Sequence, residues 1–213
     1  MDFGAGKATT LQQLLKVWPD VVPYVFDVST DEEIETNTNT DDNVKGIPLL
    51  GLNPLLNSVT SFENNVYITT RSSYSGVDLS FSQIEVIDNS DYSLDTVLSA
   101  QDIEGNTAGF INASVIVSAS QGYFVANETF FSPSYFELST VYQFNPSTGD
   151  ILEANVAETG TEQISSIALD SADFLWLSVS NPTLPGVDIV DTDNNVKVIP
   201  RLATELNPGS IVF

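Results

Sequence analysis

The amino-acid sequence predicts an all-β protein built from antiparallel hairpins, and three observations support this. Short apolar runs rich in β-branched and aromatic residues alternate with clusters of Gly, Asn, Asp, Ser and Pro, as in sheets of short strands joined by turns. Four segments share an alternating strand that ends in Asp or Asn. Three of these segments follow an aromatic-rich hairpin. The hairpin and the segment after it form one copy of a repeat, and each such copy supplies four strands.

The N-terminal part of the chain contains the one segment predicted to be helical, residues 10–18. Thr9 or Thr10 would cap this helix, its leucines share one face, and Pro19 would end it. A strand is the alternative in this stretch. Residues 31–42, which are acidic and rich in Asn and Thr, predict an exposed loop or a long hairpin tip.

Each copy contains a hairpin whose turn begins at an acid or amide. The four residues at the strand ends are Asp27, Asp88, Asn145 and Asp191. Such side chains accept hydrogen bonds from their own backbone two residues on, so an Asx-turn is expected at each. These residues lie 61, 57 and 46 positions apart, close to the ~40–50-residue period of propeller blades that carry loop insertions.

A second hairpin precedes three of these turns. Its strands are expected at residues 59–62 and 66–70, at 115–117 and 123–127, and at 167–170 and 174–177. Two hairpins give four antiparallel strands, which is one propeller blade. The sequence therefore predicts a single domain, a β-propeller of about four four-stranded antiparallel blades or a fragment of a larger propeller. The approximate blades are residues 1–50, 51–104, 105–160 and 161–213.

The order of the hairpins resembles the YVTN-type propeller repeats of many bacterial and archaeal surface or periplasmic proteins. The segments that carry the resemblance are residues 66–70 (VYITT), 123–127 (YFVAN), 84–88 (IEVID) and the turn at 145–150 (NPSTGD). The resemblance covers roughly residues 20–213 and implies a binding or scaffolding propeller outside the cytoplasm. The chain departs from the family's pattern because it supplies only four blades and its first copy lacks a clear Tyr-Val-Thr-Asn-like strand. The loops at residues 72–82 and 128–139 are also longer than the family norm.

The C-terminal segment resembles the first strand of a blade, without the three strands that would follow it. Leu206, Asn207 and Pro208 match the Leu-Asn-Pro at residues 52–54, which leads into the first strand of the second copy. Since an open sheet edge is a liability, a strand near Ile211 is expected to pair with the N-terminal blade or with a partner chain.

Charge and composition exclude several classes of function. The chain has 29 acidic and 6 basic residues, a formal net charge of −23, which disfavours contact with nucleic acid or anionic lipid. It has no Cys and no His, which rules out Cys/His zinc sites, thiol nucleophiles and Ser-His-Asp triads. No apolar run approaches the ~20 residues that span a bilayer, so no membrane insertion is expected.

Two motifs weakly resemble ligand loops. Lys7 follows a Gly-Ala-Gly sequence, but it lacks the upstream Gly and the Ser or Thr that a phosphate loop requires. Residues 191–195 (DTDNN) and 88–91 (DNSD) resemble the start of a calcium loop, but the Gly and Glu at its later positions are missing. Asx-rich turns are the preferred interpretation, with a weak surface Ca²⁺ site as the alternative.

The aromatic residues divide into two groups. Six fall on strand positions expected to pack between blades: Phe62, Tyr67, Phe124, Tyr142, Phe144 and Trp176. Four others lie in the long loop of the third copy and form the candidate interaction loop, because a blade core does not explain an apolar cluster there: Phe130, Phe131, Tyr135 and Phe136.

Three functional hypotheses follow. The first is a non-catalytic propeller that binds a protein partner or self-associates in an extracytoplasmic setting, with no required cofactor. The second is a lactonase-like or hydrolase-like enzyme that binds a divalent metal in the central channel through carboxylates and Asn side chains. The third is a structural subunit of a surface assembly. The sequence favours a non-catalytic role because it contains no recognisable catalytic constellation.

Overall fold

The computed structural model confirms that the protein is all-β. Its only helices among the described residues are three 3₁₀ turns, η1 (Leu79–Phe81), η2 (Ala100–Asp102) and η4 (Val156–Glu158). The structure describes residues 9–12, 23–27, 29–34, 36, 46–72, 79–103, 109–130, 136–160 and 162–213.

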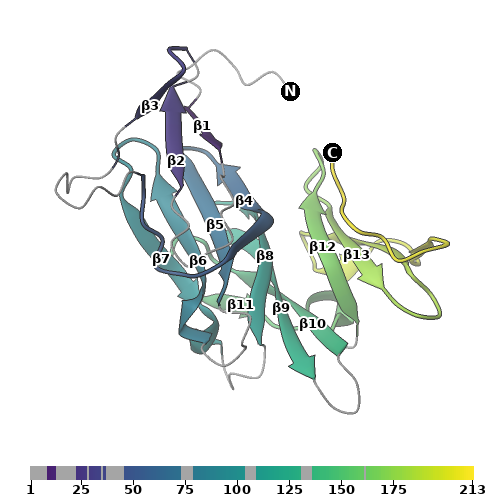
Figure 1. Cartoon of the computed structure of the whole chain (residues 1–213). Coiled ribbons are helices and arrows are strands. Elements are labelled where there is room, and N and C mark those ends of the chain that lie inside the picture. The colour runs from purple at the N-terminus through teal and green to yellow at the C-terminus, as the bar shows by residue number, and fades with distance from the viewer. Residues whose placement is uncertain are drawn as a thin grey trace.

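The described strands form four antiparallel sheets, each made from consecutive strands of the chain (Figure 1). Sheet A contains β1 (Thr9–Gln12), β2 (Tyr24–Asp27) and β3 (Glu32–Ile34). Sheet B contains β4 (Pro54–Phe62), β5 (Asn65–Arg71), β6 (Ser82–Asp88) and β7 (Leu94–Ser99). Sheet C contains β8 (Phe110–Ser118), β9 (Gln121–Phe130), β10 (Phe136–Phe144) and β11 (Ile151–Glu153). Sheet D contains β12 (Gln163–Leu169), β13 (Leu175–Ser180), β14 (Gly186–Asp191), β15 (Val196–Lys197) and β16 (Leu202–Ala203).

The predicted Asx-turns are present in all four sheets. An Oδ1 oxygen of Asp27, Asp88, Asn145 and Asp191 accepts the N–H two residues on, at 2.8, 2.7, 2.9 and 2.9 Å. The carbonyl of the same residue accepts the N–H four residues on, at 2.8 Å in every case. That fourth residue has a positive φ in each turn, so the four turns share one geometry.

The predicted N-terminal helix is wrong where the structure describes it. Residues 9–12 form strand β1, in which Thr10 pairs with Phe26 and Leu11 with Val25. An isolated helix of nine residues is marginal in water, whereas pairing with β2 gives backbone hydrogen-bond partners to one edge of this segment. The rest of the predicted helix lies outside the described residues.

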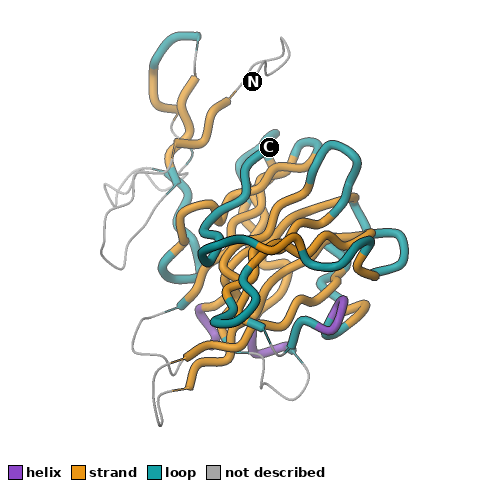
Figure 2. The backbone as a smooth tube through the Cα atoms, turned by 90° about the vertical axis from the view of Figure 1, so that its right-hand side faces the viewer, coloured by secondary structure: helices purple, strands orange, loops and turns teal. Residues whose placement is uncertain are grey.

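An apolar cluster lies at each junction between sheets that follow one another along the chain. Sheets A and B bury Val25, Ile47, Ile68 and Ile87 between them. The cluster between sheets B and C contains Tyr67, Phe124, Tyr142 and Phe144, as predicted, with Phe62 packed at its margin. The cluster between sheets C and D contains Tyr123, Val141, Leu177 and Val190. Sheets A and D therefore lie at opposite ends of the series, and sheet A stands apart from the main body (Figures 1 and 2).

Two buried serines add a polar link between neighbouring sheets. Ser82 Oγ in β6 accepts the Ile111 N–H of β8 at 2.9 Å, and Ser139 Oγ in β10 accepts the Ile164 N–H of β12 at 2.8 Å. Each serine lies six residues before its Asx-turn residue, Asp88 or Asn145. The third strand of one sheet thus binds the first strand of the next in the same way at both junctions.

The C-terminal segment does not pair with the N-terminal sheet as predicted. It runs along sheet D, where Ser165 Oγ donates to the Pro208 carbonyl at 2.7 Å and Ile211 N donates to Ser166 Oγ at 3.3 Å. The Phe213 ring meets Trp176 edge to face, with centroids 5.2 Å apart. Sheet D is adjacent to this segment along the chain, whereas sheet A lies at the other end of the series of sheets (Figure 1).

Candidate functional site

A groove lies where the first strands of three sheets come together. Strand β8 contacts both β4 and β12, and each of the three is the edge strand of its sheet. The groove has a volume of about 490 Å³, within the ~300–1,000 Å³ typical of ligand sites. Its lining consists of residues 59–62 of β4, 114–117 of β8 and 167–169 of β12, together with Asp173.

The chemistry of the groove is mostly aliphatic and hydroxylic. Val59 is 36% exposed there, and the Ser114 hydroxyl is hydrogen-bonded to Thr69 Oγ1 at 2.7 Å. Asp173 is the one ionisable residue of the lining, although the whole chain carries a net charge of −23. The groove therefore suits an uncharged ligand surface, and the surrounding field favours a cationic ligand over an anionic one.

A buried polar junction joins sheets C and D beside this groove. The Tyr123 hydroxyl donates to Asn195 Oδ1 at 2.6 Å and accepts from Gln121 Nε2 at 2.9 Å. Asn195 Nδ2 in turn donates to Glu153 Oε2 at 2.6 Å. Burial raises the pKa of the Tyr123 phenol, an effect that the hydrogen bonds from Gln121 and Gln143 only partly oppose. The phenol is therefore a neutral structural group at ordinary pH.

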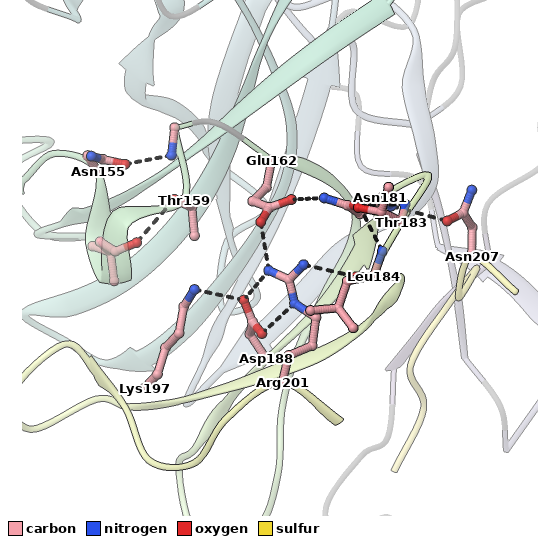
Figure 3. A network of polar contacts seen from close by, with 12 residues as sticks. Asn155, Thr159, Glu162, Asn181, Thr183, Leu184, Asp188, Lys197, Arg201 and Asn207 are labelled. Carbon is pink, nitrogen blue, oxygen red and sulfur yellow. Dashed lines mark hydrogen bonds and ion pairs between the residues drawn. The ribbon is translucent and has the colours of Figure 1, made fainter. Parts of the chain in front are cut away.

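A charged network lies on the face of sheet D that packs against sheet C (Figure 3). Arg201 binds both oxygens of the buried Asp188 carboxylate, at 2.8 and 2.9 Å, and also reaches Glu162 Oε1 at 2.9 Å. Lys197 Nζ lies 3.0 Å from Asp188 Oδ2. Burial by itself would raise the pKa of Asp188, but the hydrogen bonds from Arg201 and Lys197 outweigh burial and lower that pKa.

A buried carboxylate anchors the chain that leads into β4. Glu85 is fully buried and accepts the N–H groups of Leu50 at 2.8 Å and Gly51 at 2.7 Å. Gly51 has no room for a side chain, because a Cβ there would overlap Thr70 Oγ1. Glu85 thus positions the segment that enters the first strand of the groove.

The structure does not test the predicted interaction loop. Phe130 ends β9, Phe136 begins β10, and their backbones pair with each other. Phe131 and Tyr135 lie outside the described residues. The loop stays a prediction.

The two weak calcium motifs are Asx-turns, as preferred from sequence. Asp191 Oδ1 accepts the Asp193 N–H and its Oδ2 accepts Asn194 Nδ2. Asp88 Oδ1 accepts the N–H and the hydroxyl of Ser90. Across the described ranges, no group of three or more Asp and Glu side chains is placed to hold a metal ion.

Sequence reasoning did not identify the groove or the polar junction. The strands that line the groove were predicted, but their convergence depends on how one sheet packs on the next. The repeated order of the hairpins is the one sequence signal for the groove. This order makes β4, β8 and β12 the equivalent first strands of successive sheets, and β8 contacts the other two.

Comparisons with known proteins add no family assignment. No protein-family model matches the chain, and no curated protein shows significant similarity to it. Within the described residues, no helix is long and apolar enough to cross a membrane.

Proposed function

We propose that this protein is a non-catalytic, propeller-like binding module that works outside the cytoplasm and holds an extended polypeptide in the groove between β4, β8 and β12. The convergence of three edge strands on one groove carries the proposal. The YVTN-type resemblance supports the propeller arrangement and the extracytoplasmic setting.

An extended polypeptide suits the groove for two reasons. An edge strand offers backbone N–H and C=O groups that are not used within its own sheet, and added strands bind to such edges. The lining along β4 offers both hydroxyl and apolar side chains, because Thr60 and Ser61 lie between Val59 and Phe62. Alternate side chains of a bound strand would then meet different surfaces of the groove.

The charge of the chain predicts which peptides bind best. With 29 acidic and 6 basic residues, the protein attracts cations at long range and repels anions. We therefore expect a segment of alternating small polar and aliphatic residues, flanked by Lys or Arg, to bind more tightly than the same segment flanked by Glu.

Calorimetry with two synthetic octapeptides, identical except for Lys-Lys or Glu-Glu ends, tests the proposal. The Lys-flanked peptide should bind and the Glu-flanked peptide should bind at least about tenfold more weakly, a difference that shrinks with salt. Val59→Trp, which fills the groove, should weaken binding at least about tenfold. Val196→Trp, at a 51% exposed position on β15, is the matched control and should bind as the parent chain does. Absence of binding, or equal binding by Val59→Trp, would overturn the proposal.

A further inference from the structure

The outer face of sheet D carries residues whose counterparts in sheets B and C pack against the next sheet. Tyr67 pairs with Val86, Tyr123 with Gln143 and Trp176 with Ile189, in each case two residues before the Asx-turn residue. Tyr67 packs against sheet C and Tyr123 against sheet D. Trp176 therefore occupies, in sheet D, the position from which its counterparts contact a following sheet.

The burial of neighbouring positions supports this equivalence. Ile84 and Val141, four residues before their Asx-turn residues, are both 0% exposed beneath the following sheet. Val187 is the corresponding residue of sheet D and is only half-buried. What covers this face is the C-terminal segment, whose Val212 is 80% and Phe213 53% exposed.

Sheet A presents the complementary face at the other end of the molecule. Ile87, Phe144 and Val190, one residue before their Asx-turn residues, are at most 1% exposed because they pack on the preceding sheet. The corresponding residue of sheet A is Phe26, which is half-buried. Tyr24 of sheet A is likewise half-buried, whereas its counterpart Tyr142 is 8% exposed.

We propose that the outer face of sheet D, around Trp176 and Val187, docks the outer face of sheet A, around Tyr24 and Phe26, of a second copy of this chain. The two faces combine residue positions that already pack together at the B–C and C–D junctions. Within one copy they lie at opposite ends of the series (Figure 1). The contact is heterologous, so each copy uses a different face toward each neighbour.

The C-terminal segment competes for the same face. Three hydrogen bonds hold it on sheet D: two join Ser165 and Ser166 to residues 208 and 211, and the third joins Asn181 N to Asn207 Oδ1. No described strand lies beyond residue 203. A docked sheet would displace at least Phe213 from Trp176, so removal of residues 208–213 should strengthen the association.

Sedimentation velocity on two single variants tests this proposal. Val187→Asp disables the sheet D face and Phe26→Asp disables the sheet A face. The parent chain should associate reversibly as concentration rises, and each variant alone should lose that association. An equimolar mixture should form a 1:1 dimer and go no further, because one intact face of each kind remains. Leu152→Asp, at a 52% exposed position on β11 of sheet C and outside both faces, is the control and should associate like the parent, with circular dichroism confirming that all variants fold.

Cysteine cross-linking gives a second measurement, since the chain contains no Cys. Oxidation of a mixture of Tyr24→Cys and Val187→Cys chains should yield a disulfide-linked heterodimer. A parent chain that stays monomeric even after removal of residues 208–213, or an equimolar mixture that stays monomeric, would overturn the proposal. So would a rapid internal disulfide in the double-cysteine chain, because it would show that sheets A and D meet within one copy. Peptide binding in the groove does not enter this test, so either proposal can fail alone.

Discussion

Glu85 lies three residues before the Asx-turn residue of sheet B. The equivalent residue is Tyr142 in sheet C and the ion-paired Asp188 in sheet D. Burial raises the pKa of Glu85 above the ordinary value of 4.5, against the lowering effect of the N–H groups of Leu50 and Gly51. A raised pKa means that the folded state holds the proton more tightly than the unfolded state does. This contribution to stability is complete below pH 4.5 and is lost as the pH rises through the folded-state pKa.

Substitutions at Glu85 separate its two roles. Glu85→Ala should lower the free energy of unfolding by about 1–3 kcal/mol or more, because it leaves the buried Gly51 N–H without a partner. Glu85→Gln does not titrate, so the parent chain should gain stability relative to Glu85→Gln as pH falls from neutral toward 4.5. Urea unfolding at several pH values measures both effects. A parent-to-Gln difference that stays constant with pH would contradict the pKa shift.

At the scale of strands and sheets, the same serine hydrogen bond occurs at the junction of sheets B and C and at the junction of sheets C and D. Ser82→Ala or Ser139→Ala should each cost about 1–3 kcal/mol, because each leaves a backbone N–H at a buried junction unsatisfied. The links belong to different junctions, so the double variant should lose the sum of the single losses within about 0.5 kcal/mol. Ser147→Ala on the exposed turn of sheet C is a control and should change stability less. A strongly non-additive double variant would contradict independent junctions.

The contribution of the charged network of sheet D to the free energy of unfolding depends on pH. Arg201→Ala should cost about 3–5 kcal/mol at neutral pH, because it leaves the buried Asp188 with only the partly exposed Lys197 as a counter-charge. The lowered pKa of Asp188 makes its contribution present above its unfolded pKa and lost as pH falls through the folded value. The difference between Arg201→Ala and the parent should therefore shrink in acid, as unfolding curves at neutral and acidic pH would measure. A loss that is equal at both pH values would point to lost packing instead.

The local elements were largely predictable because their signals are local. The Asx residues at Asp27, Asp88, Asn145 and Asp191 determine where each turn begins, and alternation defines the flanking strands. The N-terminal segment was mispredicted as a helix because its leucine spacing suits a helix and its partner strand lies more than ten residues away. The groove could not be predicted, since it depends on how β4, β8 and β12 are brought together.

At the scale of the whole molecule, the high negative charge opposes the proposed association of two copies. Because both copies carry a net charge of −23, their repulsion is long-range and is screened by salt. The association of sheet D with sheet A rests on apolar residues, which salt does not weaken. The association should therefore strengthen as ionic strength rises, which sedimentation at low and high NaCl would measure. Weaker association at high salt would indicate an interface made of ion pairs.

The sequence by itself determined the all-β class, the positions of the Asx-turns and most of the strands, because alternation and turn chemistry act over a few residues. Tertiary structure decided which strands line the groove, which serines link the sheets and where the C-terminal segment lies. Ile211 shows the difference, since its segment resembles a first strand in sequence but lies along its own sheet. Contact with Ser166 and Trp176 depends on which surface is near in space, and that proximity is a property of the packed sheets.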